Sequence, residues 1–68
     1  MKFDHTKIKE LRTAHNLTVR ALADAIGVHA NVISQWEVGR TMPSMTSLEA
    51  MCTRFGIPAD YFFVPDEG

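Results

Sequence analysis

Residues 17–39 constrain the fold of this chain more than any other segment. Apolar side chains recur there with helical spacing up to Gly27, and a second such run begins at once and ends at Gly39. Glycine readily adopts the left-handed backbone that ends a helix. The segment therefore predicts two short helices that are joined by a tight turn and pack against each other.

The size and cysteine content of the chain limit how it can be stabilised. Its 68 residues suffice for one domain with a small core, and domains of this size often need a partner chain, a metal or disulfides. Cys52 is the single cysteine, and the three histidines (His5, His15 and His29) are not spaced as ligand pairs with it. We therefore expect no disulfide, no metal and no cofactor, but a partner chain is plausible.

The N-terminal segment and the overall charge bear on location and partners. No apolar run at the start is long enough for a signal peptide or a membrane span, so we expect a cytoplasmic protein without a membrane partner. Seven Lys and Arg residues face eight Asp and Glu residues, which gives a net charge of −1. Strong non-specific nucleic-acid binders are usually basic. The charge balance thus argues against that class of protein.

The remaining apolar spacing is also helical, and no segment alternates long enough to indicate a strand. We therefore expect an all-helical domain. Its first helix begins after Asp4, which serves as the N-cap, and runs to about His15. This places four side chains along one side of the helix: Ile8, Leu11, Arg12 and His15.

The two helices of residues 17–39 each have a distinct inner face. Thr18 is a good N-cap for the first, whose inner face carries Val19, Leu22, Ala23 and Ile26. The second begins near His29 and turns Val32, Ile33 and Trp36 inward. Its opposite face carries Asn31, Ser34, Gln35 and Val38. Trp36 is expected to belong to the core rather than to form a stacking platform for bases.

Two further helices complete the expected domain. Ser44 is a natural N-cap for a fourth helix, with Leu48, Met51, Cys52 and Phe55 on one face and Gly56 at its end. Pro58 opens a last short helix that runs through Asp60 to Phe63. Residues 1–7 are then a lead-in, residues 8–63 the domain with the two-helix motif at about 18–38, and residues 64–68 a frayed tail.

Several segments together resemble the Cro/phage-repressor (XRE) helix-turn-helix family. The matching segments are IKELR (8–12), LT (17–18), LA (22–23), IGV (26–28), ISQWEVGR (33–40) and PS (43–44). Their order and spacing are specific even though each fragment alone is weak. The resemblance implies a compact, all-helical, repressor-like domain of five helices that binds double-stranded DNA.

The resemblance also implies which residues read DNA bases. In the family the second helix of the motif enters the major groove and its N-terminal half reaches base edges. The matching positions here are His29, Ala30, Asn31, Ser34 and Gln35. Asn31 and Gln35 are the strongest candidates, because a carboxamide can bond adenine in a bidentate manner. In an arbitrary protein the same face would more often be an ordinary solvated surface.

Contacts to DNA phosphates are expected at Thr18, Arg20, Arg40 and Thr41 and at the start of the first motif helix. The chain departs from the family at two positions. Val19 replaces a customary glutamine, and Val38 stands where a polar residue is common before Gly39. We therefore expect modest affinity for DNA from one copy of the chain.

One pair of charged residues has a structural role in the family. Arg12 and Glu37 match an internal salt bridge that ties the first helix to the end of the recognition helix. A catalytic role for Glu37 is not expected, because no nucleophile or metal ligand accompanies it. No other arrangement of catalytic groups is apparent in the sequence, so we expect neither an enzyme nor a small-molecule substrate.

The apolar run near the C-terminus predicts a homodimer. Four successive large apolar residues on a short helix cannot all point inward: Tyr61, Phe62, Phe63 and Val64. A symmetric dimer through this helix would hold two recognition helices about 34 Å apart over a palindromic operator.

Two functions remain open from the sequence. The leading hypothesis is a sequence-specific transcriptional regulator, most simply a repressor. The alternative is a protein-interaction module on the same fold, such as an antitoxin or adaptor, that binds a partner through its apolar C-terminal helix. The acidic charge balance, Val19 and the aromatic C-terminal run motivate the alternative.

Overall fold

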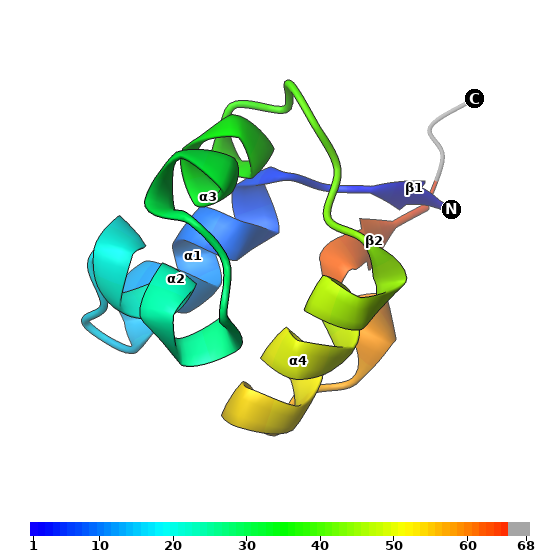
Figure 1. Ribbon diagram of the computed structural model, residues 1–68. Helices are drawn as coiled ribbons and strands as arrows, with labels where there is room; N and C mark the ends of the chain where they lie inside the picture. Colours follow the sequence, from blue (N-terminus) through cyan, green and yellow to red (C-terminus); the bar gives the residue numbers. More distant parts are fainter. Residues whose placement is uncertain (66–68) are drawn as a thin grey trace.

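The computed structural model describes residues 1–65 of the chain. Within this part, four α-helices and one 3-10 helix surround a single core, and two short strands lie side by side (Figure 1). The elements in chain order are β1 (Lys2–Phe3), α1 (Thr6–Ala14), α2 (Val19–Ile26), α3 (Ala30–Glu37), α4 (Met45–Phe55), η1 (Ala59–Phe62) and β2 (Phe63–Val64).

Side-chain caps set the starts of α2 and α4, as the sequence predicts. The Thr18 hydroxyl accepts a hydrogen bond from the Ala21 amide at 3.0 Å, and the Ser44 hydroxyl accepts one from the Ser47 amide at 3.2 Å. Both helices end at a glycine in the left-handed conformation, Gly27 with φ 76° and Gly56 with φ 65°. These boundaries follow from local chemistry and are confirmed.

The start of α1 differs from the prediction by one residue. His5, not Asp4, occupies the N-cap position, and its side chain makes no capping hydrogen bond. Asp4 still serves this end of the helix, because its Oδ1 accepts from the Thr6 hydroxyl at 2.6 Å and from the Thr6 amide at 3.0 Å. These bonds hold the pKa of the Asp4 carboxyl below its usual range. The imidazole of His5 is thereby left available for another contact.

The expectation of an all-helical domain with five helices is wrong in one region. The segment after Pro58 forms only a single 3-10 turn, after which Phe63 adopts extended backbone with φ −118° and ψ 146°. β2 then pairs antiparallel with β1, so that Lys2 faces Val64 and Phe3 faces Phe63. The predicted lead-in therefore includes a paired strand. The predicted tail begins at Val64, which lies in β2, and residues 66–68 of that tail are outside the described residues.

The aromatic run at the C-terminus packs largely within its own chain. Phe62 is fully buried, and Tyr61, Phe63 and Val64 are half-buried. The Phe3 ring lies 6.2 Å from the Phe62 ring and 5.7 Å from the Phe63 ring, centre to centre. The premise that all four residues lie on a short helix is therefore wrong: a change from 3-10 to extended backbone lets Phe62 face the core, while the other three side chains stay half-buried. Phe62 cannot contact a second chain.

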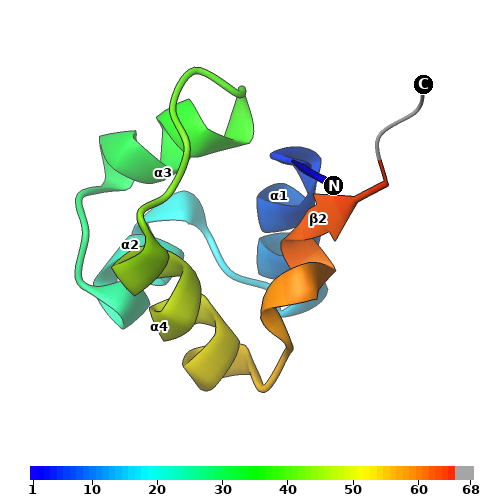
Figure 2. The same ribbon diagram turned by 90° about the vertical axis from the view of Figure 1, so that its right-hand side faces the viewer.

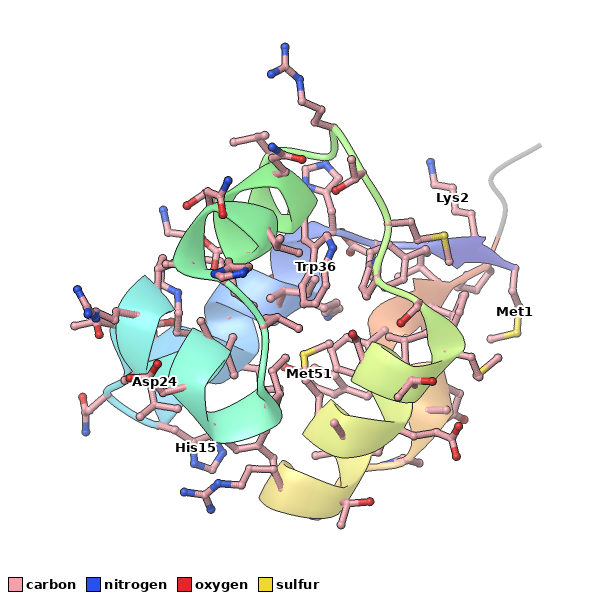
Figure 3. The ribbon with its side chains drawn as sticks, viewed as in Figure 1. Met1, Lys2, His15, Asp24, Trp36 and Met51 are labelled. Atoms are coloured by element: carbon pink, nitrogen blue, oxygen red, sulfur yellow. The ribbon has the colours of Figure 1, made fainter. Side chains whose placement is uncertain are left out.

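The core lies between the helices and η1, where Trp36 and Met51 point inward in Figure 3. Its buried members are Ile8, Leu11, Leu22, Ala23, Ile33, Trp36, Leu48, Met51 and Phe62. The core assignment of Trp36 is confirmed, since only 3% of its surface is exposed. Cys52 packs beside this cluster, and burial raises the pKa of its thiol, which keeps it protonated as a small apolar group.

Candidate nucleic-acid interface

One face of α3 presents polar side chains to solvent. Asn31 and Ser34 are exposed, one helical turn apart, while Ile33 and Trp36 on the other side of the helix are buried. Gln35 and Ala30 are half-buried. His29 is exposed at the N-cap of α3 and makes no side-chain capping bond, so its ring adds a polar group beside this face. These five residues, the predicted base-reading set, all lie along the N-terminal two turns of α3.

The four residues predicted to contact phosphates are also exposed. Thr18 and Arg20 lie at the start of α2, and Arg40 and Thr41 lie in the loop after α3. Arg40 and Thr41 therefore follow the C-terminal end of α3, while Thr18 and Arg20 belong to the start of α2, which packs against α3. The amide dipoles at the start of α2 add positive potential there.

The charge near α3 differs from that of the whole chain. Among residues 18–41 the acidic side chains are Asp24 and Glu37, and the carboxylate of Glu37 is ion-paired with Arg12. Arg20 and Arg40 are both exposed, and most acidic residues lie outside this segment. The net charge of −1 is thus a poor guide to the potential at this surface.

Arg12 and Glu37 form an almost buried ion pair. Arg12 Nε donates to Glu37 Oε2 at 2.7 Å and Arg12 Nη2 donates to Glu37 Oε1 at 3.2 Å, a bidentate arrangement. The side chains are only 14% and 10% exposed. Arg12 Nη1 also donates to the Leu17 carbonyl at 2.9 Å, so one guanidinium joins α1, the α1–α2 turn and the end of α3.

The structure shows a second contact to the end of α3, which was not predicted from the sequence. The His5 Nδ1 atom lies 2.8 Å from the main-chain carbonyl oxygen of Glu37. A carbonyl oxygen only accepts, so Nδ1 carries the proton and donates. No sequence signal singles out this contact, because the two residues are 32 positions apart.

A groove of about 540 Å³ runs beside α3, between α3, the following loop and the start of α4. Val28, Val32, Trp36 and Met42 contribute apolar lining, and His29, Gln35, Thr41, Ser44 and Ser47 contribute polar groups. Two predicted base-reading residues and one predicted phosphate contact therefore line one depression. Met42 was not singled out in the sequence, although 56% of its surface is exposed.

The two departures from the family pattern have different environments. Val19 is half-buried and packs against the core, so it contributes to stability at the start of α2. Val38 is 73% exposed at the end of α3 and offers only an apolar surface.

Residues 1–65 show neither a cluster of metal ligands nor a membrane-spanning helix. Across residues 1–65, no group of three or more His, Cys, Asp and Glu side chains is arranged to hold a metal ion. No helix in this range has the length and apolar character needed to cross a membrane.

Comparison with known proteins identifies the fold. Residues 8–62 match the profile of a helix-turn-helix family. The chain belongs to this family, in its XRE/Cro branch. Its α2 and α3 are the two helices of the helix-turn-helix, and α3 is in the position of the recognition helix.

Solved structures of helix-turn-helix proteins agree with this arrangement. The P22 c2 repressor, solved with a synthetic operator, is 27% identical and superimposes with a TM-score of 0.83 over 97% of this chain and 100% of that one. The restriction-modification controller protein C.AhdI from Aeromonas hydrophila is 25% identical, with a TM-score of 0.78 over 87% of this chain and 89% of that one.

A curated relative is longer than this helix-turn-helix chain. The HTH-type transcriptional activator BcrR from Enterococcus faecalis is 36% identical over 67 residues, which cover 98% of this chain and 32% of that protein. The chain thus spans about a third of the length of that relative.

Proposed function

We propose that this helix-turn-helix chain is a sequence-specific regulator of transcription that binds double-stranded DNA in the cytoplasm and reads the major groove with α3. The observation that carries the proposal is the division of α3 into a buried apolar face and an exposed face with Asn31 and Ser34. A helix of this kind, supported from behind by a second helix, fits the width of the major groove.

The relatives support DNA as the partner. The structure of the P22 c2 repressor contains a synthetic operator, and its backbone superimposes on the whole helix-turn-helix of this chain. One relative is named a repressor and another an activator. A protein bound across a promoter excludes other proteins from it, and we propose repression as the mode of action on this ground.

Binding can be tested with a pool of random duplexes. Rounds of selection should enrich one sequence, and fluorescence anisotropy should then give at least about a thousandfold preference over random DNA, as for typical specific binders. A chain that binds no enriched sequence better than random DNA would contradict the proposal.

Replacing Arg40 by alanine should weaken binding to all sequences by a similar factor. We expect the slope of log K against log salt to become less steep by about one, because one phosphate contact is lost. The measurement is a set of titrations between low and physiological salt. Lys9, an exposed residue on α1, provides the control variant Lys9→Ala, whose slope should equal that of the unmodified chain. An unchanged slope for Arg40→Ala would remove this residue from the proposed interface.

We further propose that two copies pair through Tyr61, Phe63 and Val64 on a palindromic operator. These side chains are half-buried, and in both Figure 1 and Figure 2 β2 lies apart from α3, so pairing there would leave α3 free. Sedimentation equilibrium with the enriched duplex should give two chains per duplex. A single chain per duplex at micromolar concentration would contradict this dimer.

The alternative, a protein-interaction module, loses one of its three motivations, because the aromatic C-terminal run packs largely within the chain. A different observation favours a protein contact: Val38, Met42 and Met45 are 73%, 56% and 68% exposed within one short segment. An antitoxin or adaptor that binds its partner here would keep that partner when Asn31 is changed, and co-purification of the Asn31→Ala chain would test this.

A further inference from the structure

The last carbonyl groups of α3 accept hydrogen bonds from two sources: main-chain amides just after the helix, and the side chain of His5. A helix leaves its last four carbonyl groups without partners inside the helix. Here the residues that directly follow α3 serve three of them: Val38 N donates to Ser34 O at 3.2 Å, Gly39 N to Trp36 O at 3.1 Å, and Arg40 N to Gln35 O at 2.9 Å. The fourth, Glu37 O, accepts from His5 Nδ1 at 2.8 Å. His5 thus completes this helix end from another part of the chain.

The same imidazole ring packs against the first turn of the loop. Gly39 has φ +80°, and a Cβ atom placed there would lie 2.9 Å from His5 Cδ2 and 3.0 Å from His5 Nε2. Real Cβ atoms essentially never come within 3.0 Å of another atom, so a side chain at this position would require the His5 ring to shift. The ring therefore contacts both the last residue of α3 and the glycine that turns the chain away from it.

Glu37 is consequently held at two points by one element. His5, the N-cap of α1, holds its main-chain carbonyl, and Arg12 within α1 holds its carboxylate. Two contacts, one from α1 and one from its N-cap residue, hold the end of α3 in position. Arg40 and Thr41 come after Val38 and Gly39, and both of their amides donate to Gln35 O, at 2.9 Å and 3.4 Å.

We propose that His5 is a positioning residue for DNA binding. By closing the end of α3 and packing on Gly39, it fixes the course of the loop so that Arg40 and Thr41 meet the phosphate backbone. The inference rests on the proposed function, because it assigns His5 a role in that same interface. His5 itself touches no DNA in this arrangement.

Three substitutions separate the hydrogen bond from the bulk of the ring. His5→Asn places an amide donor near the position of Nδ1, His5→Gln places it near that of Nε2, and His5→Phe keeps a ring without a donor. Thr6→Ala is the matched control, since it removes the bond to Asp4 at the same end of α1 without touching α3.

The first measurement is amide hydrogen exchange of residues 39–41 in the free chain. His5→Phe and His5→Gln should speed exchange of these amides about five- to tenfold, the worth of one hydrogen bond. His5→Asn should restore slow exchange, and Thr6→Ala should leave these amides unchanged. Equal exchange in the Asn, Gln and Phe variants overturns the inference, and it does so whether or not the chain binds DNA.

The second measurement is a double-mutant cycle on the enriched duplex. His5→Phe alone should weaken binding about tenfold, and it should weaken binding by less than about threefold in an Arg40→Ala background, because the loop contact is already gone. Strictly additive effects overturn the positioning role and leave His5 as a contributor to stability alone. Failure of the unmodified chain to bind any duplex rejects the proposed function instead, while the exchange rates still decide whether His5 holds the loop.

Discussion

Replacing Arg12 by alanine should lower the free energy of unfolding by about 3–5 kcal/mol, because it leaves the Glu37 carboxylate almost buried without its charged partner. The Leu17 carbonyl also loses its hydrogen bond. A domain of this length has a total stability of roughly 3–10 kcal/mol, so the variant should be close to unfolded at room temperature. Urea denaturation followed by circular dichroism measures the loss.

The control removes both charges of the ion pair together. Arg12→Met with Glu37→Met should recover most of the lost stability, since methionines of similar length fill the space without a buried charge. If Arg12→Ala instead costs less than about 1 kcal/mol, the pair behaves like an exposed salt bridge and does not hold α1 to α3.

The helices could be predicted because their signals are local. Thr18 and Ser44 bond amides three residues ahead, and Gly27 and Gly56 end helices through their own backbone conformation. The strand pair could not be predicted in this way, since Lys2 and Val64 meet from opposite ends of the sequence. Two-residue strands are also too short to show alternation, so the apolar run around Phe62 had the pattern of a protruding helix.

In the candidate site, too, features with a local sequence signal could be predicted and features that join distant residues could not. The exposed positions of Asn31 and Ser34 follow from the period of the helix. The Arg12–Glu37 pair came only from resemblance to a family, because no spacing rule joins residues 25 positions apart. The contact of His5 with Glu37 had no local signal in the sequence, because it joins residues 32 positions apart, and it follows only from the way α1 and α3 pack together.

Replacing Asn31 by alanine should reduce the preference for the enriched sequence about 5- to 150-fold, the equivalent of 1–3 kcal/mol for one bidentate contact. Asn31 is exposed and its replacement removes no packing, so the free energy of unfolding should stay within about 0.5 kcal/mol. Gln35 is half-buried and lines the groove. Gln35→Ala should therefore reduce the preference for the enriched sequence and also lower the free energy of unfolding, so Asn31→Ala is the cleaner test of base reading.

A matched change in the DNA makes the test of Asn31 specific. If its carboxamide bonds an adenine, replacing that base by 7-deazaadenine removes the N7 acceptor and should weaken binding of the unmodified chain about tenfold or more. The Asn31→Ala chain should bind both duplexes equally, because it no longer bonds N7. Arg40→Ala should stay sensitive to the base, since a phosphate contact carries no sequence information. If the unmodified chain binds every 7-deazaadenine duplex as tightly as its parent, Asn31 does not bond adenine N7.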